Sequence, residues 1–166
     1  MKKNQIVYNM RLSEHLDLSE VIRSESAKRL GISNMPTAEH IANFKILAEN
    51  IFEPIRNNFR VPIHISSAYR SVALNKAIKG SATSQHCKGE AIDVDMDGSS
   101  NGVTNRMVFD YIHKNLNFDQ LIWEFGTNEN PDWVHVSYNS KGTQRKQVLK
   151  AVRGANGTTY QPYINK

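Results

Sequence analysis

The chain has 166 residues, of which 39% are hydrophobic and 22% are charged. This length gives one domain of ordinary size, and the composition excludes a chain that is disordered throughout. The longest apolar runs are a few residues, far below the roughly 18 that cross a bilayer, so we expect no membrane insertion. Cys87 is the only cysteine, which excludes an intrachain disulfide and a zinc site built on paired cysteines.

The charge balance is basic, because 21 Lys and Arg residues against 16 Asp and Glu residues give a net charge of +5. This favours anionic partners such as nucleic acid, phospholipid head groups or cell-wall polymers. The basic residues form no continuous arm, so we expect no nucleic-acid partner. Residues 1–6 are basic but lead into no apolar segment, which predicts no secretory signal and synthesis in the cytoplasm.

Capping residues, glycine stops and apolar spacing divide the chain into helices and strands. In chain order, the predicted elements are a helix at 20–30 ending at Gly31, a helix after Thr37 with an apolar stripe to Ile55, a strand at 61–66, a helix at 71–79, a strand at 91–96, a helix at 104–115, and strands at 120–125, 133–138 and 145–152. Early helices and later strands predict an α+β fold, with helices packed on a largely antiparallel sheet. We expect a single domain over 1–166 with its core at about 12–152, and a loosely held tail at 153–166.

One polar cluster surrounds the predicted strand at 91–96. His86 lies in the turn before this strand, and Gly89 lets the chain fold back. Because side chains alternate along a strand, Asp93 and Asp95 share one face and the apolar residues between them face the core. The sequence therefore predicts that the His86 imidazole and the Asp93 carboxylate meet in a cleft.

A second polar cluster begins the predicted strand at 133–138. His135 lies within this strand, and Asp132 stands at its entry. Together with His86 and Asp93, His135 completes a set of two histidines and one aspartate. Such a set can form an open zinc site whose fourth position is free for water. A further carboxylate beside that water can act as a general base. These residue types are the minimum equipment of a metal-assisted peptide hydrolase.

Together these clusters resemble the zinc D-alanyl-D-alanine peptidase group. The residues that carry the resemblance are Ser-x-His-x-x-Gly-x-Ala-x-Asp at 84–93 and Asp-x-x-His at 132–135. It continues into the Ser-Ser-Ala-Tyr-Arg-Ser segment at 66–71 and the helix end at 24–32, and covers roughly 12–150. The group contains bacterial DD-carboxypeptidases, D-Ala-D-Ala dipeptidases and phage endolysin peptidases. Its fold is shared with hedgehog signalling domains. Ala68 departs from the family, which often has glycine there.

The resemblance implies a role for each matching residue. One Zn²⁺ per chain would be held by His86, Asp93 and His135. Asp132 would be the general base, and Arg70 would polarise the scissile carbonyl and stabilise its oxyanion. Ser84 would form a hydrogen bond with the substrate.

The implied activity is a zinc peptidase that cuts the peptide part of peptidoglycan, at a bond next to D-alanine. The small size, the positive charge and the expected lack of a signal favour a phage or prophage endolysin. Such a protein stays in the host cytoplasm until a holin opens the membrane, and then acts on the cell wall. We expect a monomer whose partners are peptidoglycan peptides.

Two other functions remain open within this resemblance. A cytoplasmic dipeptidase or carboxypeptidase acting on D-Ala-D-Ala would explain the lack of a signal equally well. A non-catalytic, hedgehog-like zinc module would keep the ligands but could dispense with Asp132 and Arg70, whose presence counts against it.

A calcium site is the remaining alternative. Asp93, Asp95, Asp97 and Gly98 match the opening of an EF-hand loop. The twelfth position is Thr104, which cannot supply the bidentate carboxylate, and the preceding segment has a strand pattern. We therefore expect no EF-type calcium site.

Overall fold

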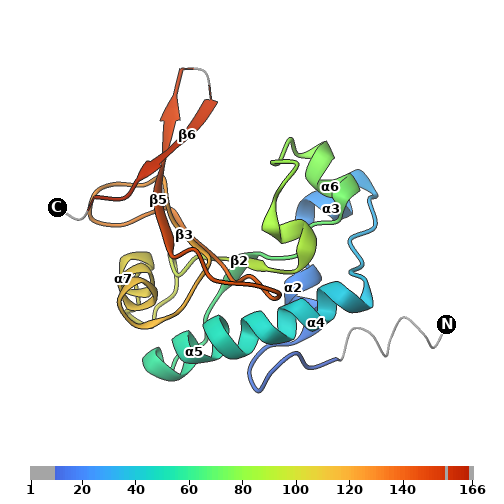
Figure 1. Cartoon of the computed structure of the whole chain (residues 1–166), viewed down its shortest axis with the longest axis horizontal. Helices are drawn as coiled ribbons and strands as arrows, with labels where there is room; N and C mark the ends of the chain where they lie inside the picture. Colours follow the sequence, from blue (N-terminus) through green and yellow to red (C-terminus); the bar gives the residue numbers. More distant parts are fainter. Residues whose placement is uncertain (1–9, 156, 165–166) are drawn as a thin grey trace.

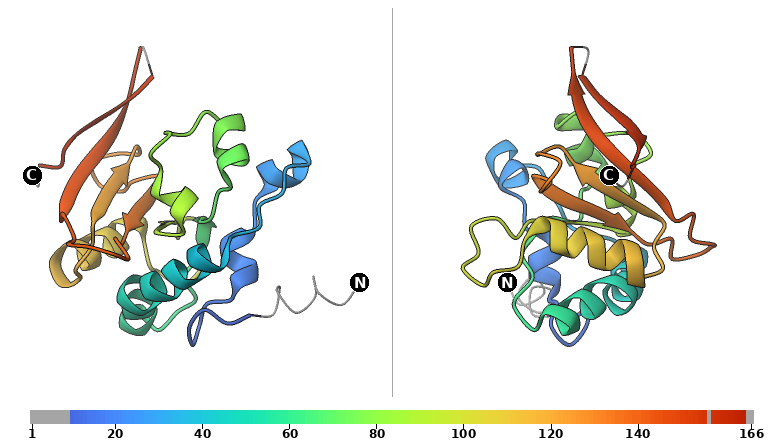
Figure 2. Two further views of the ribbon diagram at one scale, coloured as in Figure 1. Left: turned by 45° about the vertical axis from the view of Figure 1, so that its right-hand side comes forward. Right: turned by 90° about the vertical axis from the view of Figure 1, so that its left-hand side faces the viewer.

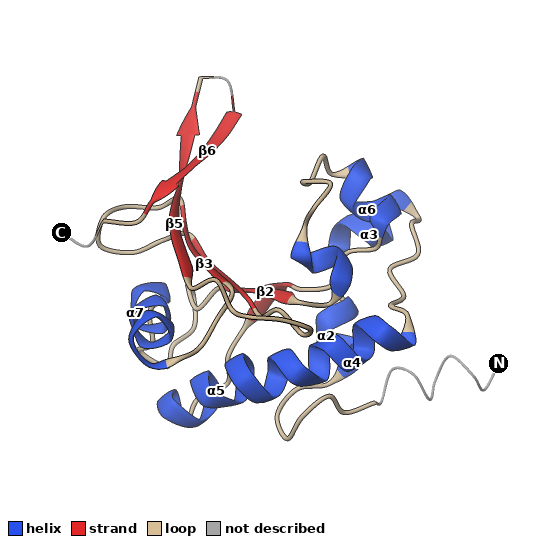
Figure 3. Ribbon diagram, in the orientation of Figure 1, coloured by secondary structure: helices blue, strands red, loops and turns tan. Residues whose placement is uncertain are grey.

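The computed structural model describes residues 10–155 and 157–164, so the basic start at 1–6 lies outside the described residues. It has an α+β fold with a six-stranded sheet in the order β1-β2-β4-β3-β5-β6 (Figures 1 and 3). Adjacent strands are antiparallel except for the parallel pair β3 and β5, which confirms the predicted fold class. The strands are β1 Ile65–Ser67, β2 Ala91–Val94, β3 Gln120–Glu124, β4 Trp133–Ser137, β5 Gln147–Gly154 and β6 Gly157–Pro162.

Several of the described helices begin at hydroxyl side chains that cap them. The Thr37, Ser71 and Thr104 hydroxyls each accept a hydrogen bond of 3.2 Å from the backbone N–H three residues on. The described helices are α2 Leu18–Ile22, α3 Glu25–Leu30, α4 Ala38–Leu47, the π-helical turn η1 Ala48–Phe52, α5 Glu53–Phe59, α6 Val72–Ala77, the 3₁₀ turn η2 Gln85–Lys88 and α7 Asn105–Asn115. None of them combines the length and the apolar character that crossing a membrane requires.

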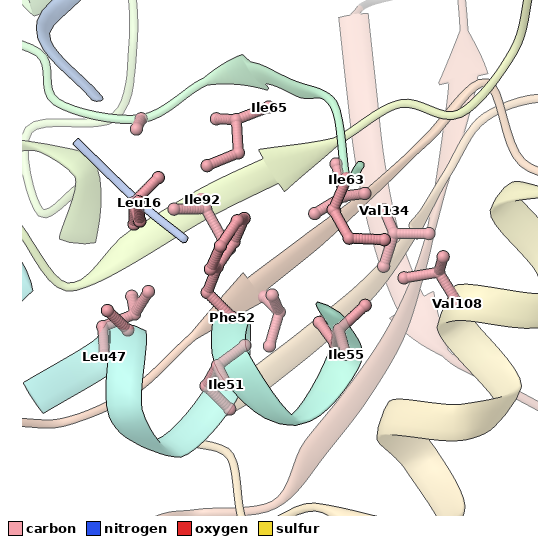
Figure 4. Close-up of a cluster of buried hydrophobic side chains, with 14 of the residues drawn as sticks. Leu16, Leu47, Ile51, Phe52, Ile55, Ile63, Ile65, Ile92, Val108 and Val134 are labelled. Atoms are coloured by element: carbon pink, nitrogen blue, oxygen red, sulfur yellow. The ribbon is translucent and has the colours of Figure 1, made fainter. Parts of the chain in front are cut away.

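The core lies between one face of the sheet and the helices α4, α5 and α7. Figure 1 shows α4, η1 and α5 running on as one long helix. The π-helical turn carries Ile51 and Phe52, which are buried together with Ile55 in α5. These side chains pack with Ile92 of β2 and Val134 of β4 (Figure 4). The helices therefore cover one sheet face and leave the opposite face available to form a site.

Two of the predicted elements differ most from the structure in their bounds. The helix predicted at 20–30 is split into α2 and α3, because Arg23 is extended and the Ser24 hydroxyl caps a new helix at Ala27 N–H. The strand predicted at 61–66 is reduced to β1, Ile65–Ser67. Pro62 has no N–H to donate to a ladder, which disfavours pairing at the start of the predicted strand.

The tail expected to be loosely held instead extends the sheet. Residues up to Gly154 continue β5, and β6 pairs with it in antiparallel register from Leu149↔Pro162 to Gly154↔Gly157. The glycines that suggested a loose tail thus pair at the closed end of a hairpin. The hairpin stands out from the rest of the fold in each view (Figures 1 and 2).

Candidate metal centre

Strand pairing places two of the predicted ligands face to face. Asp93 of β2 is directly opposite His135 of β4, so both side chains lie on the sheet face away from the helices. The third predicted ligand, His86, comes from η2, which leads into β2. All three side chains are buried, and their ligand atoms lie within 4.8 Å of one another. The structure therefore brings the three residues of the predicted zinc site to one point.

The donor atoms of this group fit a divalent metal. Oδ1 of Asp93 lies 2.9 Å from Nδ1 of His135 and 3.2 Å from Nε2 of His86, and the two nitrogens are 3.2 Å apart. Two imidazole nitrogens and one carboxylate oxygen are a ligand set found in zinc sites. His86, Asp93 and His135 could hold the ion together.

The orientation of His86 follows from its surroundings. Its Nδ1 is 2.6 Å from the Ala68 carbonyl oxygen, so Nδ1–H donates there and Nε2 is left to face Asp93. Gly89 ends η2 at φ +71°, and a Cβ at this position would collide with the backbone oxygen of His40 in α4. The glycine of the sequence motif thus lets η2 approach α4 closely and carry His86 into the site.

The pKa directions suit metal ligands. Burial lowers the pKa of His86, which favours a neutral imidazole. Burial alone would raise the pKa of Asp93, but the charges and hydrogen bonds of His86 and His135 hold it far below its usual range. A neutral imidazole and an ionised carboxylate are the protonation states that coordinate a metal.

Arg70 lies beside the metal group, and Ser84 lines the same cavity. Nη2 of Arg70 is 3.6 Å from Oδ2 of Asp93, and the backbone N–H of Arg70 donates to the His86 carbonyl. The Nε atom of Arg70 is buried without a hydrogen-bond partner among the described residues. Ser84 immediately precedes η2, and it lines the same cavity as Arg70 and the three ligands.

Asp132 is not brought to this cavity. Its side chain is 44% exposed, and Oδ2 lies 3.5 Å from Nη2 of Arg153 in the hairpin. The residues that line the cavity do not include Asp132 or Asp95. Asp95 follows the end of β2, and its carboxylate accepts hydrogen bonds from Asp97 N–H and the Asn105 amide. The predicted acidic face of β2 is therefore limited to Asp93.

Glu124 is a cavity residue that the sequence motifs do not mark. It ends β3, lines the cavity, and is only 6% exposed. Burial, with a smaller effect of the Asp93 charge, raises its pKa to about 7 against the opposing charges of His135 and Arg70. Side-chain alternation in the predicted strand places Glu124 on the same face as Gln120 and Ile122. Only the pairing of β3 with β4 shows that this face is the one that bears His135.

The cavity extends well beyond the metal group and has a volume of about 1500 Å³. Lys79 and Gly80 after α6 line one side of it, and Thr158 and Tyr160 of the hairpin also contribute to the wall. Asp119 and Arg145 line it too, and the Asp119 carboxylate accepts hydrogen bonds from both Arg145 and the Gln85 side chain. This network attaches η2, and with it His86, to the sheet.

Comparison with known proteins identifies the family. The family model described as Peptidase M15 matches residues 14–137, three quarters of the chain, and this span includes all three residues of the metal group. No curated protein sequence matches the chain. Since the match covers most of the described fold and the whole ligand set, the chain belongs to the peptidase M15 family of metallopeptidases.

Proposed function

We propose that this protein is a zinc-dependent peptidase that cuts the peptide part of peptidoglycan next to D-alanine, in the role of a phage or prophage endolysin. The observation that carries the proposal is the convergence of His86, Asp93 and His135 beside Arg70 in a member of the M15 family. When bound to such a ligand set, zinc acts as a Lewis acid and lowers the pKa of water to about 7.

The residues around the ligands supply the remaining functions of a peptidase. The Arg70 guanidinium lies next to the ligand carboxylate and lines the cavity, so it can donate to the oxygen that becomes negative during attack on a carbonyl. The Ser84 hydroxyl lines the cavity and is available to orient the peptide. Hydrolysis also needs a group that takes a proton from the attacking water, and the position of Asp132 outside the cavity leaves that task to another residue.

The cavity supports a substrate larger than a free dipeptide. Its volume of about 1500 Å³ exceeds the roughly 300–1,000 Å³ of typical small-molecule pockets. Lys79 and Lys88 line it and form no ion pair within the described residues, so their charges suit carboxylates of a bound peptide. The net charge of +5 favours approach to an anionic wall. We therefore propose peptidoglycan stem peptides as partners rather than free D-Ala-D-Ala.

Digestion of purified peptidoglycan tests this function. We expect the protein with one zinc per chain to reduce the turbidity of a cell-wall suspension, and mass spectrometry of the fragments to show new peptide ends next to D-alanine. Removal of the metal with EDTA should stop the reaction, and added zinc should restore it. If the protein releases alanine from free D-Ala-D-Ala but leaves cell walls intact, the function is that of a dipeptidase and this proposal is wrong. A zinc-loaded protein that cleaves neither substrate would favour the binding module.

The endolysin role needs a separate measurement in cells. Expression in a bacterium should leave growth unchanged, and co-expression with a holin should cause lysis that the His86→Ala variant does not cause. Lysis without the holin would contradict retention in the cytoplasm until membrane opening.

A further inference from the structure

The buried carboxylates of the described chain differ in one respect. The four buried acidic residues are Glu90, Asp93, Asp119 and Glu124. Three of them have partners: Glu90 accepts from Ser140, Asp93 contacts the two histidines, and Asp119 accepts from Arg145. The carboxylate of Glu124 has no hydrogen bond or ion pair with residues 10–155 and 157–164. Among the described residues, the fully buried side-chain atoms without a partner do not include the Glu124 oxygens, and Glu124 lines the cavity, so its carboxylate is left to face the contents of the cavity.

Strand register places this carboxylate beside the metal group. In the pairing of β3 with β4, Ile122 is opposite His135 and Glu124 is opposite Trp133. Directly opposite residues share a face, so Glu124 lies on the face of His135 and Asp93. Glu124 and His135 are diagonal neighbours, whose backbones are about 7–8 Å apart, a distance that long side chains reach across.

We propose that Glu124, in place of Asp132, is the general base of the peptidase. The assignment rests on the proposed function, because it names the proton acceptor of that reaction. Glu124 takes a proton from water as the water oxygen forms a bond with the peptide carbonyl carbon. The carbon–nitrogen bond then breaks, and Glu124 returns the proton to the leaving nitrogen. Substrate gains one water in total, and Glu124 ends as it began.

The environment of Glu124 matches this task. A general base must lie within reach of the water that it deprotonates, and Glu124 lines the cavity on the sheet face that bears Asp93 and His135. Asp132 lacks this environment, because its carboxylate is 44% exposed and lies near Arg153. The Asp132 backbone N–H donates to the Glu124 carbonyl, so the two residues are neighbours whose carboxylates differ in burial.

Three amide variants test the assignment: Glu124→Gln, Asp132→Asn, and Glu129→Gln as a matched change on the exposed turn after β3. Each is measured for zinc content, melting temperature, kcat and KM on the same peptidoglycan peptide. We expect Glu124→Gln to keep about one zinc per chain, to bind the uncut peptide as well as the wild type, and to lose about 10²–10⁴-fold in kcat. The Glu129→Gln variant should match the wild type.

A second readout separates proton transfer from structure. Glu124→Asp keeps a carboxylate and should recover part of the lost kcat. The acid limb of the wild-type pH–rate profile should be absent from the residual activity of Glu124→Gln. The assignment is overturned if Asp132→Asn shows the large loss while Glu124→Gln keeps its rate, or if Glu124→Gln loses its zinc. A wild type that cleaves no peptide refutes the proposed function itself, and a Glu124→Gln protein that still cleaves refutes only the base.

Discussion

Asp93 and His135 are paired directly across β2 and β4, and Nδ1 of His135 lies 2.9 Å from Oδ1 of Asp93. The pairing of the strands therefore fixes the distance between these two candidate ligands. The third ligand, His86, is on η2, outside the strands, and is oriented by the Ala68 carbonyl. Two of the candidate ligands therefore depend on strand pairing for their positions, and the third depends on the turn η2.

Replacement of His135 with Ala should abolish metal binding and activity together. Two of the three ligands would remain, and Asp93 would lose its partner on the opposite strand. Elemental analysis should find far less than one zinc per chain. His113→Ala, a change at an exposed histidine outside the metal group, should keep the metal. Full zinc content in His135→Ala would remove this residue from the ligand set.

Replacement of Arg70 with Ala should separate catalysis from metal binding. Loss of a donor to the developing oxyanion should lower kcat by about 10²–10³-fold. Zinc content should stay near one per chain, because Arg70 contacts Asp93 but is not itself a ligand. Arg70→Lys should recover part of the rate through its charge. If Arg70→Ala loses its zinc, the ion pair with Asp93 is structural and the catalytic role is contradicted.

The Asp119→Asn variant should show a stability defect that depends on pH. Burial raises the pKa of Asp119, but hydrogen bonds and charge from Arg145, with a contribution from Gln85, lower it below its usual 3.8. The folded protein therefore favours the ionised form. This stabilisation is complete above pH 3.8 and is lost as the pH falls through the lower folded value.

Urea denaturation of both proteins at pH 7 and at low pH measures this effect. At pH 7 the variant should be about 1.5–3 kcal/mol less stable, the range for hydrogen bonds to charged groups. The difference should shrink as the pH falls below 3.8. An equal difference at both pH values would show that the charge of Asp119 contributes nothing.

Calcium should have little effect on the protein. The carboxylate of Asp95 is occupied by Asn105, that of Asp97 by Asn130, and the segment before the loop is β2, where an EF-hand has a helix. Calorimetric titration should detect no binding tighter than roughly millimolar. Micromolar binding that raises activity would revive the EF-hand interpretation.

The sequence predicts the metal group better than the rest of the site. His86, Asp93 and His135 are marked by motifs, and strand alternation already places Asp93 and His135 on defined faces. Glu124 has no motif, and its role depends on which strand lies beside β4, a long-range pairing that alternation cannot show. Asp132 is near His135 in sequence, but the entry of a strand does not fix the direction of its side chain, which lies near Arg153 and outside the cavity lining.

The helices and strands are likewise predicted well only where local sequence determines them. The Thr37 hydroxyl correctly marks the start of α4, because capping depends on residues three positions apart, and the Ser71 and Thr104 hydroxyls cap α6 and α7 in the same way. The hairpin of β5 and β6 escapes prediction, because a Gly- and Asn-rich segment can close a turn or stay loose, and only its neighbours decide. Here β5 joins the sheet through its parallel pairing with β3.

The hairpin contributes a part of the cavity wall that lies outside the segment matched by the family model. All three residues of the candidate metal group lie within the segment 14–137 that matches the family, whereas Thr158 and Tyr160 lie beyond it. A protein engineer can therefore exchange residues 157–162 for another hairpin and alter the shape of the cavity wall while the ligand set stays in place. Libraries in which this short segment is exchanged, screened on different peptides, would show how far the hairpin determines the choice of substrate.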